Sequence, residues 1–212
     1  MITPLAVLLA VLGGAWGFVA DRVGARWPAH DDGHVRAVDW RTPVSVATGA
    51  LALGAVTLRF PEPVAAAIFG AYLAALVLLL ATDLDQRLLP DLITLPAIPL
   101  ALLTVLAAVN PFVGIGDLPI TLAVAVIVPL LLALFAIPFG AGAIGMGDLK
   151  LLVSVGILAG PLRLVTGVVY GALLAGVVIV VLLAARRITL KTYIPFGPFL
   201  IYGAMWAILV FR

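Results

Sequence analysis

The amino-acid sequence predicts an all-α polytopic membrane protein with about eight transmembrane helices in one bundle. Of its 212 residues, 65% are hydrophobic and only 10% are charged, whereas a soluble domain is about 45 to 50% apolar. The apolar residues form long runs between charges and Pro/Gly clusters, and most runs approach the roughly 20 residues that cross a bilayer. Because a backbone in lipid must satisfy its own hydrogen bonds, we expect these runs to be helices.

Eight apolar runs, taken in order along the chain, give the expected transmembrane spans. The first has no basic residue before it and is followed by Asp21 and Arg22, so we expect a retained helix with its N-terminus outside the cytoplasm rather than a cleaved signal. The sixth is short, which predicts a start inside the bundle. Gly167, Gly171 and Ala175 in the seventh predict close helix packing. The expected spans are residues 3–20, 43–58, 64–82, 92–109, 118–139, 149–162, 164–185 and 194–211.

The basic residues predict how the bundle is oriented in the cell inner (cytoplasmic) membrane. With the N-terminus outside, only Arg59, Arg163 and Arg212 lie outside, and the other basic residues lie on the cytoplasmic side, as the positive-inside rule requires. The cytoplasmic set is Arg22, Arg26, Arg36, Arg41, Arg87, Lys150, Arg186, Arg187 and Lys191. We divide the chain into residues 1–42, the first transmembrane helix with a short cytoplasmic loop, and residues 43–212, the main bundle.

Charge and cysteine content exclude several classes of function. The net charge of +2 is too small to neutralise many phosphates, so we expect no nucleic-acid partner. The absence of cysteine excludes disulfides, thiolate metal sites and cysteine nucleophiles. The two histidines, His30 and His34, lie in a polar stretch that favours a solvated loop over a metal site. We therefore expect neither a metal nor another cofactor.

Four of the ten acidic residues lie where a carboxylate in or beside lipid needs an explanation. Asp83 abuts the uninterrupted apolar run 64–81, whereas the role of Asp85 is open between an ion pair with Arg87 and support of a site. Asp91 follows a proline and precedes an apolar run, which is typical of a helix N-cap. The remaining six acids fall in loops or short turns and are Asp21, Asp31, Asp32, Asp39, Glu62 and Asp117.

The fourth of these acids, Asp148, follows Gly145 and Gly147 in the loop that opens the sixth span. The glycines let a backbone pass close to the carboxylate. Asp83 and Asp148 should share the cytoplasmic side, where two carboxylates can act on water as acid and base. Asp83, at the C-terminal end of a helix, should keep its proton, and Asp148, at an N-terminal end, should be the anion.

Two other functions remain open at this point. Intramembrane acids also serve proton relays, so the alternative is a proton-coupled transporter or channel. A purely structural membrane subunit would instead pair its acids with Arg87 and Lys150.

Three segments resemble the signature segments of type IV prepilin peptidases, in the same order. They are DLDQRLLPD at 83–91, GMGDLKL at 145–151 and YIPFGPFL at 193–200. The resemblance covers roughly residues 43–212 and implies that this part of the chain is the transmembrane bundle of a peptidase. Members of that family are membrane-embedded aspartic endopeptidases of the Gly-x-Gly-Asp class. They cut the short basic leader from prepilins and pseudopilins at the cytoplasmic face of the membrane.

The resemblance implies that Asp83 and Asp148 are the catalytic aspartates, with Asp83 preferred to Asp85 for its spacing to Asp91. It implies two partners, a prepilin or pseudopilin with an apolar N-terminal helix and membrane lipid. Many bacterial members also carry a zinc-binding cysteine insert and methylate the new N-terminus with S-adenosylmethionine. Neither is expected here, because the chain has no cysteine. The candidates for binding substrate or shaping the site are Asp85, Arg87, Gly145, Gly147, Lys150, Pro195 and Gly197.

Overall fold

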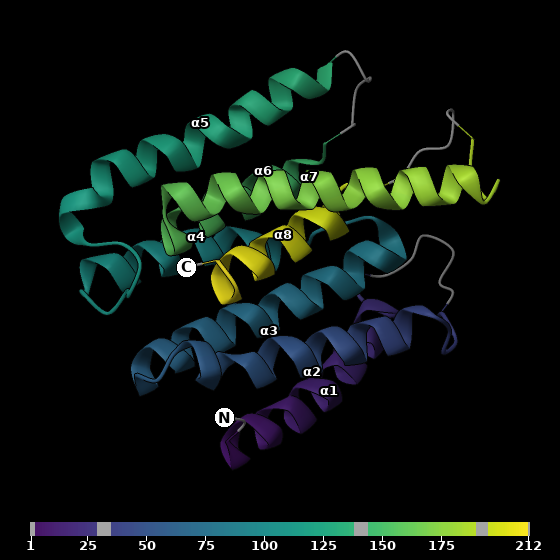
Figure 1. The fold of residues 1–212 in the computed structure, drawn as a ribbon, viewed down its shortest axis with the longest axis horizontal. Coiled ribbons are helices and arrows are strands. Elements are labelled where there is room, and N and C mark those ends of the chain that lie inside the picture. Colours follow the sequence, from purple (N-terminus) through teal and green to yellow (C-terminus); the bar gives the residue numbers. More distant parts are fainter. Residues whose placement is uncertain (1–2, 29–34, 138–143, 190–194, 212) are drawn as a thin grey trace.

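The computed structural model describes residues 3–28, 35–137, 144–189 and 195–211, which form a bundle of helices (Figure 1). These residues contain eight α-helices, one short 3-10 helix and no strand. The all-α prediction is therefore confirmed. In chain order the elements are α1 (Pro4–Gly24), α2 (Arg41–Arg59), α3 (Pro63–Gln86), α4 (Asp91–Leu106), η1 (Ile115–Asp117), α5 (Leu118–Ala136), α6 (Met146–Ala159), α7 (Pro161–Ala184) and α8 (Gly197–Leu209).

Four stretches of the described chain are long and apolar enough to cross a membrane. They are α1, α3, the continuous segment Ile115–Ala136 and α7. Helices α4 and α8 are apolar but shorter, with 16 and 13 residues, and α6 has 14. Length and composition thus support a helical membrane protein with four spans, and not the predicted count of about eight.

Two helices run further than the sequence predicted. Helix α1 continues to Gly24 and α3 continues to Gln86, so Asp21, Asp83 and Asp85 all lie inside helices. The assignment of Asp21 to a loop was therefore wrong. Charged residues were taken as the ends of spans, but a buried charge is tolerated in a helix when partners from other segments satisfy it.

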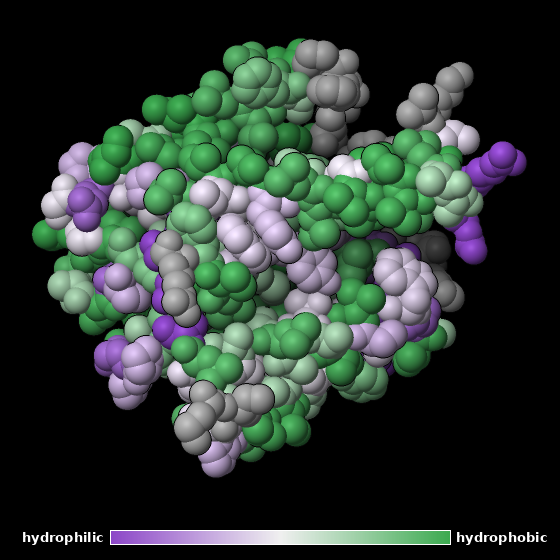
Figure 2. Space-filling model, viewed as in Figure 1, coloured by the Kyte–Doolittle hydropathy of each residue, from purple (hydrophilic) through white to green (hydrophobic). Residues whose placement is uncertain are grey.

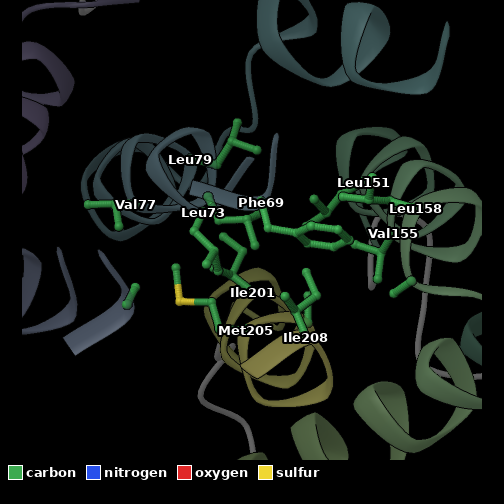
Figure 3. Packing of buried hydrophobic residues seen from close by; sticks show 14 of the residues in the cluster. Phe69, Leu73, Val77, Leu79, Leu151, Val155, Leu158, Ile201, Met205 and Ile208 are labelled. Carbon is green, nitrogen blue, oxygen red and sulfur yellow. The ribbon is translucent and has the colours of Figure 1, made fainter. Parts of the chain in front are cut away.

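The apolar core lies between α3, α6 and α8 (Figure 3). Phe69 and Leu73 of α3 are fully buried and pack with Val155 of α6 and Ile201 of α8. Although α6 is short, nine of its 14 residues are buried, so it packs inside the bundle. The core thus fixes α3 and α6, the two helices that carry Asp83 and Asp148.

Glycine contacts bring α7 and α8 close together, as the small residues of the seventh span predicted. A Cβ atom on Gly167 would lie 2.9 Å from the carbonyl oxygen of Gly203, and one on Gly171 would lie 2.6 Å from that of Phe199. Both distances are shorter than real Cβ contacts, so only glycine allows this approach.

The surface in Figure 2 is mostly hydrophobic, and its strongly hydrophilic residues gather toward the two ends of the bundle. One end holds both described arginines that the sequence placed outside the cytoplasm. Arg59 donates to the carbonyl oxygen of Phe211 at 3.2 Å, and the Arg163 guanidinium lies 3.9 Å from the ring centroid of Phe112. Asp83 lies at the other end of α3, which begins shortly after Arg59.

Candidate active site

The two predicted catalytic aspartates, Asp83 and Asp148, meet at the start of α8. Their exposed fractions are only 4% and 8%. A Cβ atom on Gly197 would overlap Oδ2 of Asp83 and lie 3.0 Å from Oδ1 of Asp148. Both carboxylates therefore face the same small space beside the Gly197 backbone, although they are 65 positions apart in the sequence.

Asp148 is held by the first turn of its own helix. Its Oδ2 accepts a hydrogen bond from the backbone N–H of Gly145 at 3.1 Å, and Asp148 is the only acid in that turn. The N-terminal end of a helix carries a partial positive charge from its free N–H groups. Both features favour the anionic form of this carboxylate.

Asp83 lies in the opposite electrostatic setting, in the last turn of α3. Arg87 ends this helix in a left-handed conformation with φ of 56°, and its N–H donates to the carbonyl oxygen of Asp83 at 2.9 Å. Oδ2 of Asp83 is buried and accepts no hydrogen bond within the described part of the chain. A buried oxygen near carbonyl dipoles is poorly suited to carry a negative charge.

Gly147 sets the approach of α6 to the segment before α4. A Cβ atom there would lie 2.7 Å from Cβ of Leu89 and 3.1 Å from its carbonyl oxygen. Gly145 is different, because the nearest atom to its Cβ would be Oδ2 of Asp148 at 3.4 Å, an ordinary contact. The structure thus requires glycine at position 147 and not at position 145.

A cavity of about 410 Å³ opens beside the two aspartates. Six of the predicted site residues line it: Asp83, Arg87, Gly145, Gly147, Asp148 and Lys150. The sequence did not single out three apolar members of the wall, Leu88, Leu89 and Met146. Leu88 and Met146 have large exposed fractions, 46% and 69%. All three lie inside the two motifs, at 83–91 and 145–151, which is the sequence signal that could have identified them.

Asp91 also lines the cavity, and the prediction that it caps α4 was wrong. Pro90 is the N-cap residue and makes no side-chain cap, whereas Asp91 is the first residue of the helix. Its Oδ1 accepts a hydrogen bond from Nζ of Lys150 at 2.6 Å. The carboxylate thus links the start of α4 to the start of α6 instead of capping the free N–H groups of α4.

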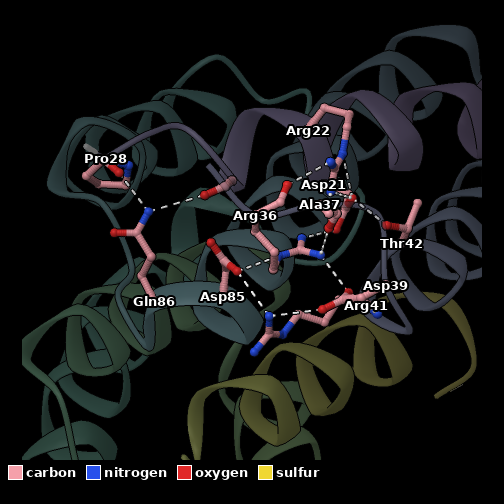
Figure 4. Close-up of polar contacts among 11 residues, drawn as sticks. Asp21, Arg22, Pro28, Arg36, Ala37, Asp39, Arg41, Thr42, Asp85 and Gln86 are labelled. Atoms are coloured by element: carbon pink, nitrogen blue, oxygen red, sulfur yellow. Dashed lines mark hydrogen bonds and ion pairs between the residues drawn. The ribbon is translucent and has the colours of Figure 1, made fainter. Parts of the chain in front are cut away.

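Three predicted site residues do not line the cavity: Gly197, which lies against the two aspartates, Pro195 and Asp85. Pro195 is partly buried two residues before Gly197. Asp85 accepts hydrogen bonds from Arg36 and Arg41 in the polar network of Figure 4. Arg36 also donates to Asp21, which is fully buried. The sequence missed Asp21 because two of its three partners, Arg36 and Thr42, belong to other segments, and only Arg22 is its neighbour in the chain.

No group of three His, Asp or Glu side chains that could hold a metal occurs in the part of the chain that the structure describes. His30 and His34 lie outside the described residues. Two tyrosine hydroxyls inside the bundle form hydrogen bonds with other side chains: Tyr72 with Ser154 at 2.7 Å, and Tyr202 with Thr48 at 2.9 Å.

A helical bundle with two buried carboxylates at one end defines a candidate membrane-embedded acid–base site. Comparison with protein families identifies the group to which it belongs: a sequence model of the type IV leader peptidase family matches residues 70–185, more than half of the chain. The protein belongs to this family, as its three motifs predicted, and membership implies a peptidase. No curated protein and no solved structure matches the chain.

Proposed function

We propose that this protein is an aspartic endopeptidase that removes the leader peptide from prepilin-like proteins at the cytoplasmic face of the membrane. One observation carries the proposal: Asp83 and Asp148 are both buried and face one small space beside a cavity. Proton transfer needs groups within hydrogen-bond reach of the reacting atoms. This is the one place in the described chain where two acids of the family motifs come together.

The different settings of the two aspartates support separate roles. Asp148, held as an anion at a helix start, takes a proton from the attacking water. Asp83, protonated at a helix end, donates its proton to the oxygen of the scissile carbonyl, giving a tetrahedral diol. Return of the Asp148 proton to the leaving nitrogen breaks the C–N bond, while Asp83 recovers a proton from a diol hydroxyl. Both carboxyls thus return to their starting states.

The charges at the site support a substrate with a basic leader followed by an apolar helix. Asp91 lines the cavity, and although it is paired with Lys150 its side chain is 59% exposed, so its carboxylate is accessible to the leader. The apolar part of the substrate would lie against the hydrophobic outer face of the bundle. In this proposal the described helices cross the membrane as eight spans, and the cavity opens on the side with most of the basic residues.

Cleavage of a leader-bearing prepilin in vesicles tests this function. The protein should shorten the substrate at the junction between leader and apolar segment, and mass spectrometry of both fragments identifies the cut bond. A matched substrate with the same junction but without its apolar helix should be cut far more slowly, because it is not concentrated in the membrane. Absence of cleavage at the junction would contradict the proposal.

A further inference from the structure

Asp83 and Asp85 lie two positions apart in the last turn of α3, so their side chains point to nearly opposite sides of the helix, about 200° apart. Asp83 faces Asp148 and Gly197. Asp85 faces away from the cavity toward the segment before α2, and its side chain is only 2% exposed. Whatever holds Asp85 therefore also fixes the rotation of the turn that carries Asp83.

Arg36 and Arg41 both donate to Asp85 on that second side, and Arg36 also reaches α1. Its guanidinium donates to Asp85 of α3, to Asp21 of α1 and to Asp39, so one side chain joins three carboxylates (Figure 4). Burial alone would lower the pKa of Arg36, but its hydrogen bonds with Asp21 and Asp85 raise the pKa above the ordinary value. The group is therefore a permanent cation.

Further contacts attach the same turn to the end of α1. Gln86 donates to the carbonyl oxygens of Gly24 at 3.2 Å and Pro28 at 2.7 Å. A Cβ atom on Gly24 would lie 3.1 Å from the backbone of Ala81, so the two helices touch through their main chains. The end of α3 is thus held from one side by α1 and by the segment around Arg36.

We propose that Arg36 is a positioning residue of the peptidase: through Asp85 it fixes the last turn of α3, and thereby the distance between Asp83 and Asp148. This inference rests on the proposed function of the two aspartates. Catalytic groups must be held within about 0.5 Å of their working positions. A misplacement of about 1 Å can lower the rate on the order of 100-fold. Three carboxylates gathered by a planar, multidentate guanidinium provide such a constraint.

The chain contains no cysteine, so a spin-label pair can measure the site geometry independently of activity. Leu88 follows α3 and Met146 begins α6, and both are exposed. Labels on L88C and M146C should give one narrow distance distribution. R36Q should broaden or shift it, whereas R187Q should not, because Arg187 is exposed and lies beyond the end of α7.

Kinetics of unlabelled variants complete the test. R36Q should lower kcat by on the order of 10- to 100-fold with little change in KM. R36K keeps the charge but not the geometry and should be partly active. The double variant R36Q/D85N restores the charge balance, so it should regain thermal stability and remain slow with a broad distance distribution.

A stabilising role alone would give the opposite result for the double variant, with stability and kcat recovered together. That outcome, or a narrow distribution with nearly full activity in R36Q, would overturn the proposal. Because the label distances do not depend on catalysis, they can support or reject this constraint even if Asp83 and Asp148 prove not to be catalytic.

Discussion

At the scale of single residues, the site depends on two carboxylates of the same type in different surroundings. Asp148 accepts a hydrogen bond from the N–H of Gly145 at the start of α6. Asp83, in the last turn of α3, has a buried Oδ2 that accepts no hydrogen bond from the residues the structure describes. Each helix end shifts the energy of a charge by roughly 0.3 to 1 kcal/mol, and by up to about 2 kcal/mol when partly buried. The start of α6 favours the anionic form of Asp148, whereas the end of α3 disfavours the anionic form of Asp83. The two aspartates are therefore suited to different roles.

Infrared difference spectroscopy can show which aspartate holds the proton near neutral pH. We expect a protonated-carboxyl band in the unmodified protein that disappears in Asp83→Asn and persists in Asp148→Asn. The pair titrates together, so the spectrum reports its dominant state. Loss of the band with Asp148 and its survival without Asp83 would reverse the roles.

Gly197 is the glycine at which an added methyl group would meet both aspartates. Gly197→Ala would place Cβ against Asp83 and 3.0 Å from Asp148, forcing the carboxylates apart. We expect activity to fall on the order of 100-fold and the free energy of unfolding to fall by about 1 to 3 kcal/mol.

Gly176→Ala is the matched control, because no atom lies within 4 Å of the added Cβ and the residue is inside α7. It should keep both stability and activity. Equal effects of the two substitutions, measured by thermal unfolding and cleavage rate, would show that the contact with the aspartates is unimportant.

At the scale of elements, the sequence predicted which segments are helical better than where they end. Apolar runs identified all eight α-helices, because burial in lipid or core needs continuous hydrophobic surface. The ends of α1 and α3 were missed because Asp21 and Asp85 both accept a hydrogen bond from Arg36, which lies in another segment. Such partners cannot be read from local sequence.

The motif glycines allow a sharper test of one element, the start of α6. Gly147→Ala should move α6 away from Leu89 and reduce activity on the order of 10-fold or more, since its Cβ would lie 2.7 Å from that side chain. Gly145→Ala keeps the N–H that binds Asp148 and meets only ordinary contacts. Its cleavage rate should fall much less, and a larger loss at position 145 would contradict this reading of the motif.

At the scale of the whole molecule, charge and shape divide the bundle into two ends. Arg59 and Arg163 surround Phe112 at one end, while the aspartates and the Arg36 network lie at the other. The sequence predicted this division by counting basic residues, and it predicted that Asp83 and Asp148 would share a side. It could not predict that both carboxylates lie against the Gly197 backbone, because that contact joins α3, α6 and α8.

Labelling of single cysteines in the cysteine-free chain tests the proposed orientation. L88C and R187C should react with a membrane-impermeant reagent added from the cytoplasmic side, and L162C should react from the other side. All three positions are exposed. Labelling of L88C and L162C from the same side would be incompatible with the proposed topology.

The most direct test of the central claim is the cleavage rate of a leader-bearing substrate by purified Asp83→Asn and Asp148→Asn. Because both carboxyls act in one attack of water, each substitution should remove nearly the whole rate enhancement. Asp117→Asn, at the exposed start of α5, provides a control with the same chemical change and should remain active. Full processing by either the Asp83 or the Asp148 variant would remove that aspartate from the mechanism and contradict the account.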